Sequence, residues 1–393
     1  MSHKFFEFFA GGGMARAGLG RNWACAFAND FDPNKASAYR ANWGESDLLL
    51  GDINVITPKQ LPGTPDLVWA SFPCQDLSLA GNYLGIGSSS DKCHTRSGTF
   101  WPFWRLMQSL MKDGRSPKII VLENVFGALT SNNGQDFAAI AATFAHSGYR
   151  FGAMVIDAAK FLPHSRPRVF VVGVHPDISI PAKLLLSKPN EAWHPQALRQ
   201  AYTNISQEAK SMWVWWKLAE PPVRSSRFSD LIQDNPEGCS WHTPAETARL
   251  LGMMNSLHLG KVEAAKAIAQ SEGRLVVGGV YKRTRVDDGD KVQRAEVRFD
   301  DLAGCLRTPS GGSSRQSIIV VDQSRRVRSR LLSPREAARL MGLPDTYKLP
   351  KSYNEAYHLA GDGVAVPVVR WLAQHIFEPL LSHNLSRLAK KAA

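Results

Sequence analysis

Short runs of apolar residues alternate with longer stretches of helical periodicity from residue 4 to about residue 175. Phe137, Ile140 and Phe144, for example, recur three and four positions apart, as residues do on one face of a helix. This alternation is typical of βα units that build a parallel sheet covered by helices. We predict strands near residues 4–8, 23–28, 66–71, 118–122, 151–156 and 168–174, and helices near 13–20, 33–42, 100–113 and 134–147.

The pattern changes between residues 176 and 310. Prolines are scattered there between polar and Trp-rich stretches, which breaks the alternation of strands and helices. We interpret this region as a separate, irregular module whose later part forms twisted strands with a basic face. A solvated charged surface without a partner is the alternative interpretation. The basic residues of this part are Lys282, Arg283, Arg285, Lys291, Arg294 and Arg298.

Regular structure is predicted to resume after this module. Ser333, followed by Pro334 and Glu336, has the form of a capping box at the start of a helix. Apolar periodicity predicts another helix over residues 366–381. The sequence therefore predicts an α/β fold with a doubly wound, mostly parallel sheet and a second, smaller, irregular domain. The expected divisions are a first domain of residues 1–175, a second of 176–310, and a C-terminal segment, 311–393, that returns to the first.

The charge and the cysteines of the chain narrow the classes of function. There are 47 Lys and Arg residues against 35 Asp and Glu residues, a net charge of +12, so nucleic acid is the natural candidate partner. The five cysteines form no Cys-x-x-Cys pair, which predicts neither a disulfide framework nor a metal site. Because we recognise no leader sequence and no apolar run of about 18 residues, we expect a cytoplasmic protein that does not bind membranes.

Three predicted strand ends carry residues suited to a nucleotide-type cofactor. The segment FAGGG, residues 9–13, joins a strand to a helix, where consecutive glycines let the backbone approach a ligand. Tight turns use glycine as well, so the segment alone is a weak signal. Asp30 ends the second strand, where a carboxylate can accept hydrogen bonds from ribose hydroxyls. Asp52, in GDI, either binds an adenine amino group or caps a helix.

Cys74 follows a buried strand, in the segment FPCQ, at the edge of the sheet where α/β proteins bind ligands. A cysteine by itself is more often a small buried hydrophobic residue than a nucleophile. The next strand, however, ends in Glu123 and Asn124 at the same edge. A thiol and a carboxyl group would then share one cleft, as covalent catalysis requires.

Two arginines, Arg166 and Arg168, occupy alternate positions at the following strand, where both would point to one face. FAGGG, the acid of NDFD, GDI, FPCQ, ENV, this R-x-R and a late GDGV stand in an order and at distances that are highly specific. In these segments the chain resembles the DNA (cytosine-5)-methyltransferases of bacteria and phages over almost its whole length. The resemblance implies a Rossmann-like class I methyltransferase fold, with a target recognition domain where the irregular module lies.

The resemblance also implies a reaction and a set of site residues. Cys74 would attack C6 of a cytosine flipped out of double-stranded DNA, and C5 would then accept a methyl group from S-adenosyl-L-methionine. Glu123 would bind N3 and the exocyclic amine of the base, Arg168 its O2, and Arg166 would support the same site. No metal is implied, and the enzyme is expected to act as a monomer. The implied cofactor-binding residues are Phe9, Gly11, Gly12, Gly13, Asp30, Phe31, Asp52, Ile53, Pro73 and Val364.

Three residues depart from the pattern that the family commonly shows, and rival interpretations stay open. Asp362 replaces a frequent asparagine, His164 a glutamine, and Met14 a glycine. A transfer RNA cytosine-5 methyltransferase would share the same motifs, but the module of about 130 residues favours DNA. The chain could also be a catalytically inactive DNA-binding homologue or, from the glycine loop alone, a dinucleotide-dependent dehydrogenase. The sequence does not predict which DNA sequence would be recognised.

Overall fold

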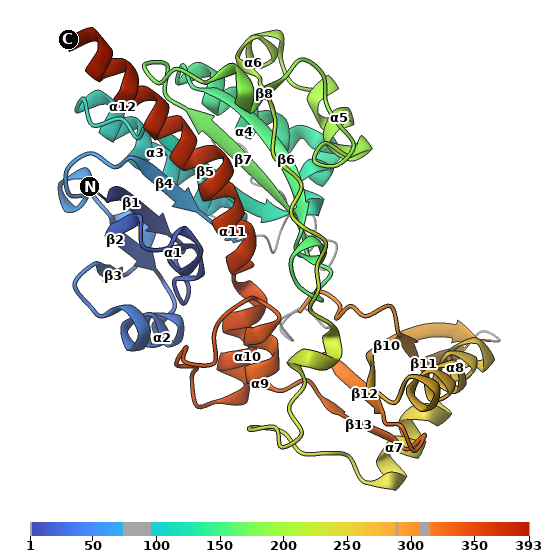
Figure 1. Cartoon of the computed structure of the whole chain (residues 1–393). Helices are drawn as coiled ribbons and strands as arrows, with labels where there is room; N and C mark the ends of the chain where they lie inside the picture. Colours follow the sequence, from blue (N-terminus) through green and yellow to red (C-terminus); the bar gives the residue numbers. More distant parts are fainter. Residues whose placement is uncertain (1, 74–95, 288–289, 307–314, 393) are drawn as a thin grey trace. The chain divides into compact units, whose positions relative to one another are not determined.

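The computed structural model describes residues 2–73, 96–287, 290–306 and 315–392. The chain divides into two compact units, shown in Figure 1. The first unit comprises Met1–Asp157, Pro167–Pro222 and Val364–Ala393, and the second comprises Ala158–Arg166 and Val223–Gly363. Among the helices that are described, none has the length and apolar character that a membrane span requires.

A seven-stranded sheet forms the centre of the first unit, with the strand order β3-β2-β1-β4-β5-β7-β6. Neighbouring strands are parallel from β3 to β5, whereas β7 runs antiparallel to both β5 and β6. The predicted α/β fold with a mostly parallel sheet is confirmed. The strands are β1 (His3–Phe8), β2 (Trp23–Asp30), β3 (Leu48–Leu50), β4 (Leu67–Ala70), β5 (Ile119–Val125), β6 (Arg150–Asp157) and β7 (Pro167–Val174).

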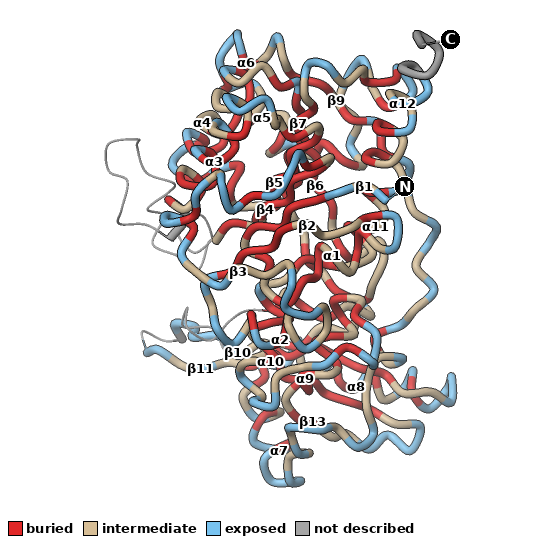
Figure 2. The backbone as a smooth tube through the Cα atoms, turned by 90° about the vertical axis from the view of Figure 1, so that its left-hand side faces the viewer, coloured by how far each residue is buried: buried red, intermediate tan, exposed pale blue. Residues whose placement is uncertain are grey.

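Helices cover the sheet of the first unit, and Figure 2 shows its central strands as buried. Strands that are buried on both faces require nearly continuous apolar sequence, which LVWA in β4 and IIVL in β5 supply. Phe6 and Phe8 of β1 point into a core shared with α3 and α4, so Glu7 between them points to the opposite face. The main helices are α1 (Met14–Leu19), α2 (Pro33–Trp43), α3 (Phe100–Lys112), α4 (Gln135–His146), α11 (Val366–Leu372) and α12 (Glu378–Ala392).

The segment 176–222 packs on the first unit, beyond the boundary at residue 175 that the sequence suggested. The backbone N–H of Val214 donates to the Phe151 carbonyl at 2.7 Å, and a Cβ added at Gly152 would lie 1.9 Å from the Val214 carbonyl oxygen. Trp213 and Trp216 are buried at this contact: the Trp213 ring packs against Phe151, and the Trp216 indole donates to the Gly152 carbonyl. Its elements are β8 (Leu185–Leu186), α5 (Gln196–Thr203), α6 (Gln207–Met212) and β9 (Trp215–Trp216).

The second unit contains a four-stranded antiparallel sheet with the order β11-β10-β12-β13. Its strands are β10 (Val276–Asp287), β11 (Asp290–Arg298), β12 (Ser317–Val321) and β13 (Val327–Leu331). Helices α7 (Pro244–Gly252) and α8 (Ser256–Glu272) share a hydrophobic core with this sheet. Since β12 and β13 complete the sheet, this unit extends past the boundary expected at residue 310. It also includes α9 (Pro334–Arg339) and α10 (Tyr353–Asp362).

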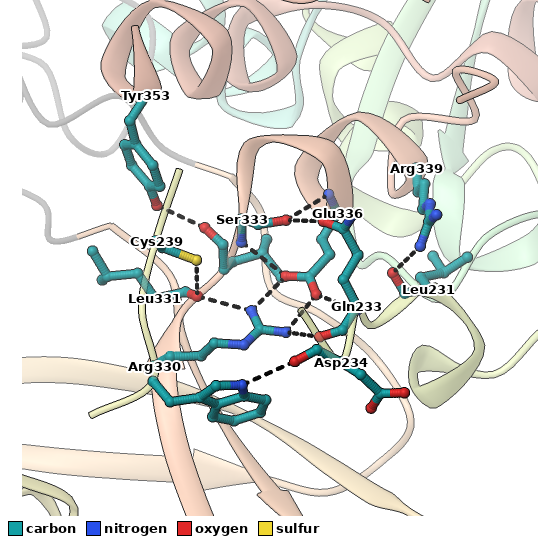
Figure 3. A network of polar contacts seen from close by, with 12 residues as sticks. Leu231, Gln233, Asp234, Cys239, Arg330, Leu331, Ser333, Glu336, Arg339 and Tyr353 are labelled. Carbon is teal, nitrogen blue, oxygen red and sulfur yellow. Dashed lines mark hydrogen bonds and ion pairs between the residues drawn. The ribbon is translucent and has the colours of Figure 1, made fainter. Parts of the chain in front are cut away.

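A fully buried ion pair connects β13 to α9 within the second unit, as Figure 3 shows. The Arg330 guanidinium lies 2.5 Å from Oε1 of Glu336, and it also donates to the Gln233 carbonyl at 2.9 Å. Glu336 in turn accepts from the backbone N–H groups of Ser333 and Gln233. The capping box predicted at Ser333 and Glu336 is thereby confirmed, because the Ser333 hydroxyl accepts from the Glu336 N–H. Both Nη atoms of Arg330 and both carboxylate oxygens of Glu336 are hydrogen-bonded, whereas Arg330 Nε has no hydrogen-bond partner among the described residues.

We expect Glu336→Gln to destabilise the second unit by about 3–5 kcal/mol, because it leaves the buried Arg330 guanidinium without a counter-charge. Urea unfolding followed by tryptophan fluorescence measures this loss. Glu263→Gln, which removes the exposed carboxylate that pairs with Lys266 and Arg325, is the control and should leave the unfolding curve nearly unchanged. Equal effects of the two substitutions would contradict the role given to the buried pair.

Candidate active site

The carboxyl ends of the parallel strands line one edge of the sheet in the first unit. β1, β2, β4 and β5 run in the same direction, so the residues that follow them come together there. Because β7 is antiparallel to β5, its first residues lie at this same edge, with Arg168 opposite Val125. The edge therefore collects the glycine loop, Asp30, Pro73, Glu123 and Arg168 from separate parts of the sequence.

Glu123 and Arg168 form an ion pair at this edge. Arg168 Nε lies 3.3 Å from Glu123 Oε1, and the two side chains are 12% and 7% exposed. Arg168 also donates from Nη1 to the Pro167 carbonyl at 2.9 Å. A carboxyl group and a guanidinium group held side by side can bind a planar ring that presents donors and acceptors along one edge. The structure thus brings together two of the predicted catalytic residues.

The end of β5 is tied to the chain that follows β4. Asn124 donates from its side-chain amide to the Phe72 carbonyl at 3.2 Å, and both residues are buried. This hydrogen bond holds the backbone leading to Pro73 beside the strand that carries Glu123. Cys74, the predicted nucleophile, lies outside the described residues, one position beyond Pro73.

Asp30 holds the glycine loop at the end of β1. Its carboxylate accepts from the backbone N–H of Gly11 at 2.7 Å and from that of Asp32 at 2.8 Å. Burial nevertheless raises the pKa of Asp30, because the loss of water outweighs these hydrogen bonds. The next residue, Phe31, is 75% exposed, which is unusual for so large an apolar ring. Its face is open to a planar ligand.

The predicted residues Asp52 and Ile53 lie at the end of β3, beside Asp30. Asp52 caps the short helix Ile53–Val55 by accepting from the Asn54 N–H. The structure therefore agrees with the interpretation of Asp52 as a helix cap. Ile53 is buried, whereas Val55 is largely exposed. Exposed apolar residues therefore accompany the acids at the ends of β2 and β3.

Trp43, on α2, packs against the glycine loop, and no sequence motif indicated this role. Its indole Nε1 donates to the Gly12 carbonyl at 2.9 Å. Gly13 has a φ of 77°, and a Cβ added there would lie 2.4 Å from the same indole nitrogen. At Gly11, by contrast, nothing lies within 4 Å of an added Cβ. The loop is thus packed on one side and open on the other.

Glu7 is a second residue that the sequence did not single out. Its side chain is buried beneath the start of α1, where it accepts from the backbone N–H groups of Arg16 and Ala15. Burial raises the pKa of Glu7 to about 8, although these hydrogen bonds and the charge of Arg16 act in the opposite direction. Within the described part of the chain, no group donates a hydrogen bond to Glu7 Oε2.

Arg166 lies in the second unit and precedes β7, which begins at Pro167. Its buried guanidinium donates from Nη2 to the carbonyls of Gly361 and Gly363, both at 2.7 Å. These two glycines flank Asp362, whose side chain is exposed. Arg166 therefore fixes the backbone of the GDGV segment.

Two further residues that the sequence singled out, His164 and Val364, are both buried. His164, also buried in the second unit, contacts the Leu340 carbonyl through Nδ1 at 2.9 Å. Val364, which follows the GDGV glycines, is buried where the chain re-enters the first unit.

Comparison with known proteins gives consistent matches. The family model for C-5 cytosine-specific DNA methylases matches residues 3–378. The chain is 26% identical over 388 residues to the Type II methyltransferase M.BsuFI of Bacillus subtilis, covering 98% of this chain and 75% of that protein. It is also 26% identical over 375 residues to the Type II methyltransferase M.HhaI of Haemophilus parahaemolyticus, covering 95% and 94% of the two chains.

Solved structures share the fold of the chain at low sequence identity. The Dnmt2 methyltransferase of S. pombe has a TM-score of 0.57 and 17% identity, covering 97% of this chain and 99% of its own. The Entamoeba histolytica methyltransferase EhMeth has a TM-score of 0.59 and 16% identity, with the same coverage.

We expect Gly13→Ala to destabilise the first unit by about 1–3 kcal/mol more than Gly11→Ala, because only the former drives a methyl group into Trp43. Both glycines have positive φ, so the backbone strain of the two substitutions is similar. Thermal unfolding of the two variants checks this. Equal losses would show that the packing of Trp43 does not constrain the loop.

Glu7 should make stability depend on pH. Because its pKa rises from an ordinary 4.5 to about 8 on folding, its contribution to stability is complete below pH 4.5 and is lost as the pH rises through 8. Relative to Glu7→Gln, the wild-type protein should therefore become less stable across this range. Urea unfolding at a series of pH values measures the difference, and parallel curves for the two proteins would refute the expectation.

Proposed function

Because the chain belongs to the family of C-5 cytosine-specific DNA methylases, we propose that it methylates C5 of a flipped-out cytosine in duplex DNA through a bond between Cys74 and C6. The resemblance found in the sequence is confirmed by the family match, and the chain is a DNA methyltransferase enzyme. Membership implies the use of S-adenosyl-L-methionine in general. The mechanism and the residues that carry it are our proposal.

One observation carries the proposal: the buried pair of Glu123 and Arg168 lies at the sheet edge to which Pro73 leads. Arg168 is suited to bind O2 of cytosine through its guanidinium. Glu123 is suited to bind N3 and the exocyclic amine of the base, N3 being an atom at which negative charge develops when C6 is attacked. Pairing with each other keeps both side chains in place before the base arrives.

The proposed reaction passes through a covalent intermediate between the protein and the base. The Cys74 thiolate forms a bond to C6, and the electrons of the C5–C6 double bond move so that N3 gains charge and C5 becomes nucleophilic. C5 would then form a bond to the methyl group as the bond from that methyl group to the cofactor's sulfonium sulfur breaks, so that the demethylated thioether leaves. Loss of the C5 proton and cleavage of the bond between sulfur and C6 restore the aromatic ring and the thiolate.

The glycine loop and the ends of β2 and β3 are the proposed cofactor site. When bound, S-adenosyl-L-methionine supplies an electrophilic methyl group. Phe31 would stack on its adenine, Asp30 would accept from the ribose hydroxyls, and the open side of Gly11 admits the methionine part. The remaining residues proposed to line this site are Phe9, Gly12, Gly13, Asp52, Ile53, Pro73 and Val364.

We further propose that the second unit is the target recognition domain. Its β10 and β11 carry the basic residues noted in the sequence, which suits a polyanion. Arg166 is proposed to act from this unit by positioning the GDGV segment rather than by touching the base. Flipping the cytosine costs a few kcal/mol, which contacts with the DNA must supply. The transfer RNA alternative loses support because the curated relatives are named Type II methyltransferases, while the likeness to Dnmt2 shows the fold alone.

Trapping on a modified base tests the nucleophile. In 5-fluorocytosine, fluorine replaces the C5 hydrogen that must leave, so the bond from Cys74 to C6 cannot be broken after methyl transfer. We expect a denaturation-resistant complex between the protein and duplex DNA containing this base. Mass spectrometry of the digested complex should find the adduct on Cys74.

The matched substitutions are Cys74→Ser and Cys239→Ser. Cys74→Ser should abolish both the complex and the incorporation of labelled methyl groups. Cys239→Ser should change neither, because serine can still donate to the Leu331 carbonyl that Cys239 contacts. An adduct that persists in Cys74→Ser would disprove the assignment.

A further inference from the structure

β10 and β11 continue beyond the four-stranded part of the second unit. β12 pairs with β10 only along Val276–Val280, whereas β11 pairs with β10 as far as Asp287 and Asp290. Residues 281–287 and 290–296 therefore form a two-stranded antiparallel segment, which we call the ribbon. It is about 20 Å long. Figure 2 shows its exposed strands running out from the second unit.

The two faces of the ribbon differ in chemistry. Side chains of paired residues alternate between the faces, so Arg283, Arg285 and Arg294 lie on one face, which we call the arginine face. Lys282 and Lys291 lie on the other, the lysine face. Thr284, Val286 and Gln293 share the lysine face. The arginine face also carries Tyr281, Asp287, Asp290, Val292 and Glu296.

Helices α7 and α8 pack on the sheet on the side of the lysine face. Val280, Ala295 and Val297, which point to that side, share a hydrophobic core with residues of both helices. The arginine face is therefore directed away from the helical layer. At the base of the arginine face Tyr281 packs against Gly304, whereas Arg283 and Arg285, farther along the ribbon, are exposed.

One acid orders two arginines on the arginine face. Arg285 Nε donates to Glu296 Oε1 at 2.8 Å, and Arg283 Nε lies 3.4 Å from Glu296 Oε2. The arginine side chains remain 50% and 51% exposed. Ion pairs this exposed add little to folding stability, so stability does not explain the arrangement. Glu296 instead holds both guanidinium groups in fixed places. Because the face carries three arginines and three acids, this fixed geometry, and not an excess of positive charge, distinguishes it from the lysine face.

We propose that the ribbon enters the major groove of the target duplex with its arginine face toward the base pairs, where Arg283 and Arg285 bind guanine edges. The major groove is about 12 Å wide and admits a two-stranded β-ribbon, and arginine binds O6 and N7 of guanine with both arms of its fork. This inference rests on the proposed function, because it takes duplex DNA as the substrate. Beyond that function, the inference names the element, the ribbon, and the face of it that would recognise the DNA sequence.

The competing explanation is that the ribbon attracts DNA by charge alone. Contacts to phosphates strengthen binding to every sequence equally, whereas contacts to bases change the preference among sequences. The ribbon offers a matched pair of variants, because Arg283→Gln/Arg285→Gln and Lys282→Gln/Lys291→Gln each remove two positive charges. All four side chains are exposed, so both variants should fold, which thermal unfolding verifies.

The wild-type protein is first expressed in a bacterial host without cytosine methylation, and its recognised sequence is read by mapping 5-methylcytosine. Binding of each variant is then measured on that duplex and on duplexes with single base-pair changes. For the arginine variant we expect at least a tenfold loss of discrimination at guanine-containing pairs. For the lysine variant we expect weaker binding to all duplexes by a similar factor, with the preference among them unchanged.

The outcomes separate the two proposals. If the wild-type protein leaves no 5-methylcytosine, the proposed function fails. If it does methylate, but the arginine variant keeps the wild-type discrimination or behaves like the lysine variant, the inference about the ribbon is overturned. Loss of discrimination in the lysine variant alone would assign base reading to the opposite face and would also overturn it.

Discussion

The ion pair between Glu123 and Arg168 is the interaction on which the proposed active site depends. It forms because β7 runs antiparallel to β5, so that the start of one strand meets the end of the other. A parallel β7 would carry Arg168 to the opposite edge of the sheet. Buried charges are costly unless they are paired, and here the pair keeps a carboxyl group and a guanidinium group at one place in a largely apolar core. Each side chain can then replace its contact with the other by a contact with a polar base. This lowers the free-energy cost of bringing that base into the site.

The glycine loop is supported in a similar way on the cofactor side. Asp30 holds Gly11 from the end of β2, and Trp43 holds Gly12 and fills the space behind Gly13. One side of the loop is thus fixed by packing while the other stays open. A ligand that binds a loop already in its final conformation loses less affinity to ordering the protein, which is the general benefit of preorganisation.

Much of the first unit could be predicted from the sequence because its strands are buried on both faces and read as short apolar runs, as IIVL in β5 does. β3 is a run of only three leucines, which are not buried, and it is too short to predict a strand. The direction of β7 and the contacts of Glu7 and Trp43 depend on residues far apart in the chain, which local patterns do not report. The prolines of segment 176–222 break periodicity and so favour a place in the second domain, but Trp193, Trp213 and Trp216 of this segment are buried within the first unit. Ser333 and Glu336, three residues apart, could be predicted because a capping box is local.

The most direct test of the account is a crystal structure of the protein with a duplex that contains its target cytosine and with the demethylated cofactor. The account predicts an extruded cytosine with N3 within hydrogen-bond distance of the Glu123 carboxyl, O2 at the Arg168 guanidinium, and C6 facing the Cys74 sulfur. A target cytosine that stays stacked in the duplex, or that is bound away from Glu123 while the ion pair with Arg168 is unchanged, would contradict it.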